Sequence, residues 1–209
     1  MKEIVIAGPL LHQLGRIYQE MEAAYNLVAT ELGFSCTGCP DNCCDSYFEH
    51  HTYAEWSYLW LGFRQLPPDD QRRILLRAEA SEQASAEALA RDERPQVMCP
   101  LNQHGLCVLY SYRLMVCRTH GVPAAMTRPD GRRLTFPGCF RCQELVAGRS
   151  KRQEGAPSME RTPLLRRLAV LENDLLEGRR HLYPKVRLTI ARMLLQGPPT
   201  RPTPHCERS

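Results

Sequence analysis

The spacing of the cysteines constrains this chain more than any other feature. Nine of its ten cysteines fall between residues 36 and 142, at Cys36, Cys39, Cys43, Cys44, Cys99, Cys107, Cys117, Cys139 and Cys142. The pairs Cys36/Cys39 and Cys139/Cys142 have C-x2-C spacing, which lets a tight turn present two sulfurs to one ion. A glycine lies beside each pair, at Gly38 and Gly138, and eases such a turn. The pattern favours a four-thiol metal site built from segments that are distant in sequence.

A cytoplasmic location fits the rest of the sequence. The opening "MKEIVIAGPLLHQLGR" has a short apolar run broken by Gly8-Pro9, which is not a secretory signal. No stretch approaches the roughly 18 apolar residues that span a bilayer, so no membrane association is expected. In a reducing compartment, a cysteine-rich pattern is more typical of metal binding than of disulfides. The odd number of cysteines between residues 36 and 142, nine, also argues against disulfide pairing. A thioredoxin-like role for Cys36/Cys39 lacks the expected βαβ context.

The number and kind of metal sites stay open. One ion needs about four ligands, so nine thiols allow two sites, or one cluster with spare thiols. Cys43 and Cys44 are adjacent, and because neighbouring side chains diverge we expect them to have different roles. Soft sulfur ligation suits zinc, an iron–sulfur cluster or Cu(I). His120, in "CRTH", is a further candidate ligand, and His50, His51 and His104 are weaker ones.

Apolar periodicity predicts a mainly α protein, with helices flanking a compact, irregular, cysteine-rich metal-binding core that has few short strands. Three-to-four spacing from Leu10 to Leu32 predicts an amphipathic helix. "TYAEWSYLWLGF" predicts a helix whose aromatic face packs in the core. The stretch that opens at "PPDD" predicts a largely exposed helix, and Asp130-Gly131 predicts a hairpin turn. One short helix is expected near "LYSYRLMVCRTHG".

These patterns give a division of the chain into four parts. We expect an N-terminal amphipathic helix at 1–33, a cysteine-cluster metal-binding domain at 34–148 with an exposed helix at 68–93, a C-terminal helical segment at 160–196, and a disordered tail at 197–209. Cys206, in the Pro-rich tail, is expected to be a bystander.

Charge is distributed unevenly along the chain. Residues 1–95 carry 15 acidic and 8 basic side chains, whereas residues 127–192 carry 15 basic and 7 acidic ones. A basic segment can bind a polyanion, but no nucleic-acid motif accompanies these arginines. We favour the interpretation that the two halves pair, or that these are solvated helix faces, and nucleic acid is a disfavoured partner.

Three segments together resemble a known family. "FSCTGCPDNCC", "CPLNQHGLCVLYSYRLMVCRTHGVP" and "PGCFRC" are similar to the YkgJ-like cysteine-cluster family of bacteria and archaea, a CxxCxxCC-type zinc- or iron-chelating domain. The first cluster departs by having three residues between Cys39 and Cys43, and Leu114 replaces the usual Pro. The resemblance covers about residues 34–142 and implies that the cysteines chelate a 4Fe–4S cluster or Zn²⁺.

The resulting hypothesis is a cytoplasmic metal-chelating protein of unknown physiological role, with an iron–sulfur cluster slightly favoured over zinc. One alternative is an enzyme, either an iron–sulfur oxidoreductase or a cluster-dependent, flagellin-type lysine methylase, although no methyl-donor site or catalytic residue is evident. Another is a zinc-stabilised binding module with a basic C-terminal surface, and a protein partner is left open. We expect Arg113 and Arg118 to offset thiolate charge as hydrogen-bond donors.

Overall fold

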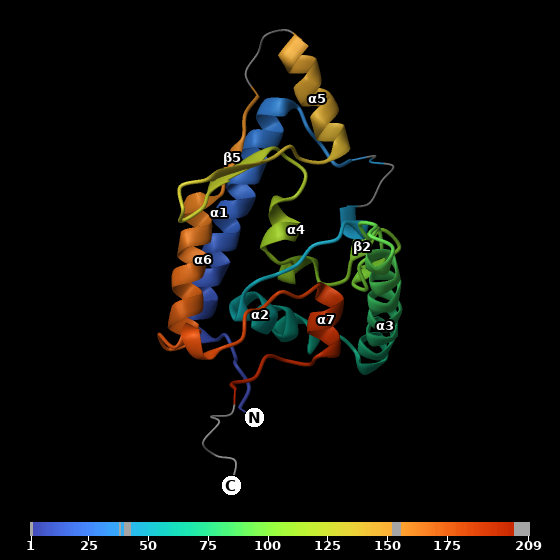
Figure 1. Cartoon of the computed structure of the whole chain (residues 1–209), viewed down its shortest axis with the longest axis vertical. Helices are drawn as coiled ribbons and strands as arrows, with labels where there is room; N and C mark the ends of the chain where they lie inside the picture. The colour runs from blue at the N-terminus through green and yellow to red at the C-terminus, as the bar shows by residue number, and fades with distance from the viewer. Residues whose placement is uncertain (1, 38, 40–42, 152–155, 203–209) are drawn as a thin grey trace. The chain divides into compact units, whose positions relative to one another are not determined.

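The cysteine region is preceded by helix α1, Gly8–Leu32, in the computed structural model of the chain (Figure 1). The side chains that α1 buries follow the predicted spacing and include Leu14, Ile17, Met21 and Val28. The helix ends at Gly33, whose φ of +63° favours glycine. The predicted helix at 10–32 is confirmed, and it leads directly to the first cysteine pair.

The structure describes residues 2–37, 39, 43–151 and 156–202, which divide into two compact units. Unit 1 consists of Met1–Leu10, Cys44–Leu114 and Leu171–Ser209, and unit 2 consists of Leu11–Cys43 and Met115–Val170. Each unit is therefore assembled from segments that lie far apart in sequence. The described part of the chain is mainly helical with few short strands, as predicted.

Unit 1 is built around helix α2, Tyr53–Phe63. The aromatic face of α2 is core, as predicted, and it buries Tyr53, Trp56, Leu59 and Phe63. The indole N–H groups of Trp56 and Trp60 both donate to the carbonyl of Met193, at 3.0 and 2.9 Å. These two hydrogen bonds connect α2 to the C-terminal helix α7, Ile190–Leu195.

Helix α3, Pro68–Ala90, packs on α7 and is otherwise largely exposed. Its only buried residues are Ile74, Ala78, Ser85 and Ala88, a narrow stripe of mostly small side chains. The predicted exposed helix at 68–93 is confirmed, with its end at Ala90. The rest of unit 1 is a two-stranded hairpin, 3₁₀ turns and loops: β1 (Asn102–Gln103), β2 (Leu106–Cys107), η1 (Cys43–Asp45), η2 (Tyr110–Tyr112) and η3 (Arg180–Leu182).

The prediction of a disordered tail at 197–209 is wrong for residues 197–202. The N–H of Ile4 donates to Pro199 O, and the N–H of Arg201 donates to Lys2 O, both at 2.8 Å. Proline lacks an N–H but keeps a carbonyl acceptor, so a Pro-rich segment can still pair along one edge. Residues 203–209, with Cys206, lie outside the described residues.

Unit 2 contains a three-stranded sheet in the order β4-β3-β5. Strands β3 (Ala124–Thr127) and β4 (Arg133–Phe136) are antiparallel, and β5 (Met159–Glu160) runs parallel to β3. The hairpin predicted at Asp130-Gly131 is confirmed, with Gly131 at a φ of +81°. The short helix expected near "LYSYRLMVCRTHG" is also confirmed, as α4, Met115–Thr119.

Unit 2 also contains helix α5 and the first part of helix α6, whose end from Leu171 belongs to unit 1. Helix α6, Thr162–Leu175, runs beside α1 (Figure 1), where Arg167 forms an ion pair with Glu20. Helix α5, Phe140–Lys151, was not predicted from the sequence. It matters for the cysteines because Cys142 lies in its first turn.

Candidate metal centre

The first C-x2-C pair forms the tight turn that its spacing predicts. The N–H of Cys39 donates to Cys36 O at 3.1 Å, which closes a turn between the two cysteines. Cys36 is exposed and Cys39 is half-buried. The hydroxyl of Tyr25, on α1, lies 3.9 Å from the sulfur of Cys36. The turn therefore begins against the side of α1.

The second pair is held by close backbone contacts. The N–H of Cys139 donates to Gly121 O at 2.9 Å, just after Gly138 at a φ of +86°. A Cβ on Gly138 would come within 2.6 Å of that same Gly121 oxygen, so only glycine fits. Gly121 has a φ of +122°, and its own Cβ would meet the Tyr25 hydroxyl, the end of a side chain, at 2.7 Å. Three residues from separate segments thus fix where Cys139 sits.

Electrostatic effects link the two pairs within unit 2. Cys142 is fully buried, and burial together with the negative charges of Cys139 and Cys36 raises its pKa to about 11. Burial, a hydrogen bond to Cys36 and the charges of Cys36, Cys139 and Cys43 also raise the pKa of Tyr25. The thiols of both C-x2-C pairs are therefore close enough to affect one another.

Arg141 contributes a positive charge to this group of thiols. Its guanidinium donates a hydrogen bond to the sulfur of Cys39, which raises the pKa of Arg141, and the charges of Cys139 and Cys36 add to the effect. Its Nη1 is buried without a hydrogen-bond partner.

Cys117 also belongs to unit 2, where it lies half-buried in helix α4. His120 follows this helix, and its N–H donates to Val116 O at 2.9 Å. The guanidinium of Arg118 lies over the ring of Tyr18 at 4.5 Å and 3.7 Å from the carboxylate of Glu22, so it contacts α1. Its predicted role as a donor to the thiols stays a prediction.

Unit 1 holds a separate set of three cysteines. Cys44, Cys99 and Cys107 are all half-buried. The N–H of Cys99 donates to Cys44 O at 2.8 Å, so the backbones of these two residues are in contact. The adjacent residues Cys43 and Cys44 therefore belong to different units.

The cysteine side chains do not form a ready-made metal site in the described residues. Across residues 2–37, 39, 43–151 and 156–202, no three Cys, His, Asp or Glu side chains are arranged to hold one metal ion. The donor set is nonetheless all sulfur, which suits zinc or an iron–sulfur cluster.

The weaker histidine candidates are placed as follows. His50 is buried, with neither ring nitrogen hydrogen-bonded, and its Nδ1 lies 3.8 Å from the carboxylate of Glu55. His51 Nδ1 lies 3.3 Å from Val186 O. His104 occupies the β1–β2 turn with a φ of +52°.

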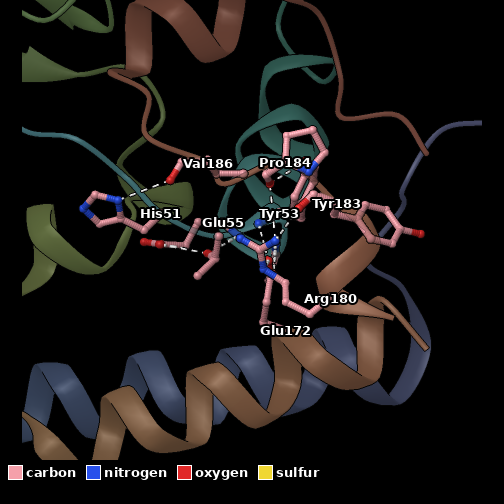
Figure 2. A network of polar contacts seen from close by, with 10 residues as sticks. His51, Tyr53, Glu55, Glu172, Arg180, Tyr183, Pro184 and Val186 are labelled. Carbon is pink, nitrogen blue, oxygen red and sulfur yellow. Dashed lines mark hydrogen bonds and ion pairs between the residues drawn. The ribbon is translucent and has the colours of Figure 1, made fainter. Parts of the chain in front are cut away.

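His51 lies beside a buried polar network in unit 1 (Figure 2). Glu172, on α6, accepts the N–H groups of Tyr53 and Ala54, both at 2.9 Å, and so caps the start of α2. Arg180 lies 3.8 Å from Glu172 and donates to Tyr183 O at 2.9 Å. Burial raises the pKa of Glu172. We assign this network to the anchoring of α2.

Part of the uneven charge along the chain is matched by ion pairs within the units. In unit 1, Arg187 pairs with Glu49 and Arg192 pairs with Glu82, both at 2.6 Å. In unit 2, α6 pairs with α1 in the same way through Arg167 and Glu20. Basic residues of the second half thus face acidic residues of the first.

Sequence reasoning missed two residues of the thiol group in unit 2, Tyr25 and Arg141. Tyr25 belonged to the apolar stripe of the first helix, where nothing distinguished it from a core residue. Arg141 had a visible signal, since it is the basic residue inside "CFRC".

In the described part of the chain, no helix is long and apolar enough to cross a bilayer. No protein-family model, no curated protein and no solved structure matches this chain. The residues and their geometry therefore carry the functional argument by themselves.

Proposed function

We propose that this chain is a metal-chelating cysteine-cluster protein, and that Cys36, Cys39, Cys139 and Cys142 hold an iron–sulfur cluster or a zinc ion. The observation that carries the proposal is the position of Tyr25 between the two C-x2-C pairs of unit 2. Its hydroxyl lies 3.9 Å from Cys36 Sγ and lies against Gly121, whose carbonyl accepts the N–H of Cys139. There the negative charges of Cys139 and Cys36 act on the buried thiol of Cys142. Four thiolates in two such pairs are a ligand set for either metal group.

The chain's own residues support this assignment in two ways. The contacts among Gly138, Gly121 and Tyr25 fix the backbone at Cys139 before any metal arrives. The guanidinium of Arg141 bonds to Cys39 and offsets part of the charge that four thiolates would bring together. A bound zinc ion would supply a structural cross-link, and an iron–sulfur cluster would supply one-electron transfer.

The resemblance to the YkgJ-like family leads to the same proposal. It rests on the ordered series of cysteines, in which Cys36 and Cys39 match the first element and either Cys139 or Cys142 matches the last. Because ligands must be deprotonated and brought together, metal binding would also stabilise unit 2 against unfolding.

The test is anaerobic purification of the full chain, followed by metal and sulfide analysis and a visible spectrum. We expect stoichiometric iron with sulfide, or stoichiometric zinc; zinc without iron or sulfide would exclude the cluster. The double variant Cys139→Ser/Cys142→Ser should lose this metal, whereas the control Cys206→Ser should keep it. A chain that is folded and metal-free after gentle purification would refute the proposal.

A further inference from the structure

The two cysteines of the second C-x2-C pair differ in how far solvent reaches them. Cys139 is half-buried, whereas Cys142 is fully buried, at 0% exposure. The first pair lacks this contrast, because Cys36 is exposed and Cys39 is half-buried. A molecule in solution can therefore approach Cys139, whereas Cys142 is accessible only to a group that already lies inside unit 2.

The start of helix α5 holds these two thiols about one helical turn apart. The carbonyl of Cys139 accepts the N–H of Gln143 at 2.9 Å, the first hydrogen bond of α5, so Cys139 occupies the N-cap position. Cys142 follows in the first turn, and helix geometry separates Cα atoms three positions apart by about 5 Å. A disulfide requires Cα atoms about 4.4–6.8 Å apart. The backbone therefore permits a disulfide between Cys139 and Cys142.

The backbone at Cys139 is fixed between strand β4 and helix α5. Its N–H donates to Gly121 O at 2.9 Å, and the side-chain amide of Gln143 donates to Gly138 O at 2.9 Å. Neither hydrogen bond involves the sulfur of Cys139. Both can therefore persist when that sulfur forms a covalent bond.

We infer that the metal-free chain carries out thiol–disulfide exchange, in which Cys139 attacks an external disulfide and Cys142 resolves the intermediate. The Cys139 thiolate attacks one sulfur of the external disulfide, which breaks its S–S bond, forms a mixed disulfide and releases the first thiolate. Cys142 then attacks the Cys139 sulfur, which forms the Cys139–Cys142 disulfide and releases the second thiolate. Two electrons pass from the cysteine pair to the external disulfide, and the two protons of the cysteine thiols leave with the released thiols.

Two exposed aromatic side chains flank Cys139 in the stretch "FPGCF". Phe136 is 36% exposed and Phe140 is 47% exposed. The ring of Phe136 also lies under the guanidinium of Arg161, at 5.0 Å. Aromatic side chains are enriched where proteins bind other polypeptides. The substrate is therefore the disulfide of a polypeptide with apolar residues beside its cysteines, in preference to glutathione disulfide.

This activity goes beyond the proposed function and uses two of its ligands. A metal held by Cys139 and Cys142 would occupy both sulfurs, so metal binding and exchange exclude each other at this pair. Exchange requires only the burial of Cys142 and the position of both cysteines at the start of α5. It does not depend on the proposed function.

The test mixes the full-length, reduced, metal-stripped chain with a peptide disulfide that has Phe beside each cysteine, or with glutathione disulfide. Products are located by peptide mass spectrometry. The wild type should end with a Cys139–Cys142 disulfide, and faster with the peptide than with glutathione disulfide. Cys142→Ser should accumulate a mixed disulfide on Cys139, and Cys139→Ser should lose exchange at this pair. The control Cys36→Ser, which removes the exposed thiol of the first pair, should form the Cys139–Cys142 disulfide as the wild type does.

The outcomes separate this inference from the proposed function. A mixed disulfide that stays on Cys139 in the wild type, or a disulfide from Cys139 to Cys36 or Cys39 in place of Cys142, would overturn the exchange. Equal rates with the two substrates would overturn the substrate class. A chain that binds metal but does not exchange refutes the inference alone, and one that exchanges but never binds metal refutes the proposed function alone.

A measurement on the unaltered chain covers variants that do not fold. The reduced, metal-stripped wild type is alkylated with iodoacetamide under native conditions, and Cys139 and Cys142 are followed by peptide mass spectrometry. Cys139 should be modified while Cys142 stays free. Prior oxidation in a glutathione redox buffer should protect both together, because they form one disulfide. Equal alkylation rates of the two thiols in the reduced chain would contradict their assigned roles.

Discussion

Substitution of Gly138 tests how the second cysteine pair is positioned. The Cβ of Gly138→Ala would lie 2.6 Å from Gly121 O, and 3.0 Å and 3.1 Å from backbone atoms of Val122 and Pro123. All three contacts are with main chain, so no side chain can rotate away. Relief must come from moving the backbone that carries Cys139, whose N–H bonds to Gly121 O.

The chain provides a matched control for this substitution. Gly131, in the β3–β4 turn of the same unit, has a φ of +81° against +86° for Gly138, but nothing lies within 4 Å of its Cβ position. A left-handed conformation costs an L-residue about 1–2 kcal/mol, and both variants incur this cost. Overpacking against fixed atoms adds about 1–3 kcal/mol, and only Gly138→Ala incurs it.

The assay is urea unfolding of the reduced, metal-stripped chain, followed by far-UV circular dichroism. We expect Gly131→Ala to lose about 1–2 kcal/mol of unfolding free energy, and Gly138→Ala to lose about 2–5 kcal/mol in total. Metal content after anaerobic purification should fall in Gly138→Ala alone. Equal stability losses in the two variants, with unchanged metal in both, would refute the account of this turn.

Three further predictions concern side chains. Glu172→Ala leaves two buried N–H groups of α2 without acceptors, and should cost about 2–6 kcal/mol in urea unfolding at about 1–3 kcal/mol for each group; a loss below 1 kcal/mol would contradict this. Burial raises the native pKa of Glu172 above 4.5, so its contribution to stability is greatest below pH 4.5 and declines as the pH rises through the native pKa. The unfolding free energy of wild type relative to Glu172→Gln should therefore fall from pH 4.5 to neutrality, and a constant difference would count against it. Arg141→Ala should weaken Zn²⁺ binding about 10–100-fold, whereas Arg128→Ala, which breaks only a surface ion pair with Asp130, should leave it unchanged.

Strong local signals explain which parts of the fold were predictable. The helix from Gly8 to Leu32 shows a long apolar periodicity and a glycine stop, and the β3–β4 hairpin carries an Asp-Gly turn. Helix α5 lacks both signals, because "FRCQELVAGRSK" has few apolar residues and contains Gly148. The local sequence pattern was therefore sufficient to predict a helix or hairpin only where its signals were strong.

Contacts between distant segments explain what could not be predicted. The cap that Glu172 places on α2 joins residues far apart in sequence, and no local pattern marks it. The pairing of Pro199 with Ile4 is of the same kind. The two C-x2-C pairs were expected to lie together because two such pairs can supply the four ligands of one metal site. The contact of Tyr25 with Cys36 could not be expected in this way, because it depends on the direction in which the chain leaves α1.

The composition of unit 1 from early, middle and late segments has a consequence for how the protein is made. Unit 2 is complete once Val170 has been synthesised, but unit 1 requires residues up to Arg201, which pairs with Lys2. Because chains emerge from the ribosome N-terminus first, we expect unit 2 to fold before the C-terminal residues that complete unit 1 have been synthesised.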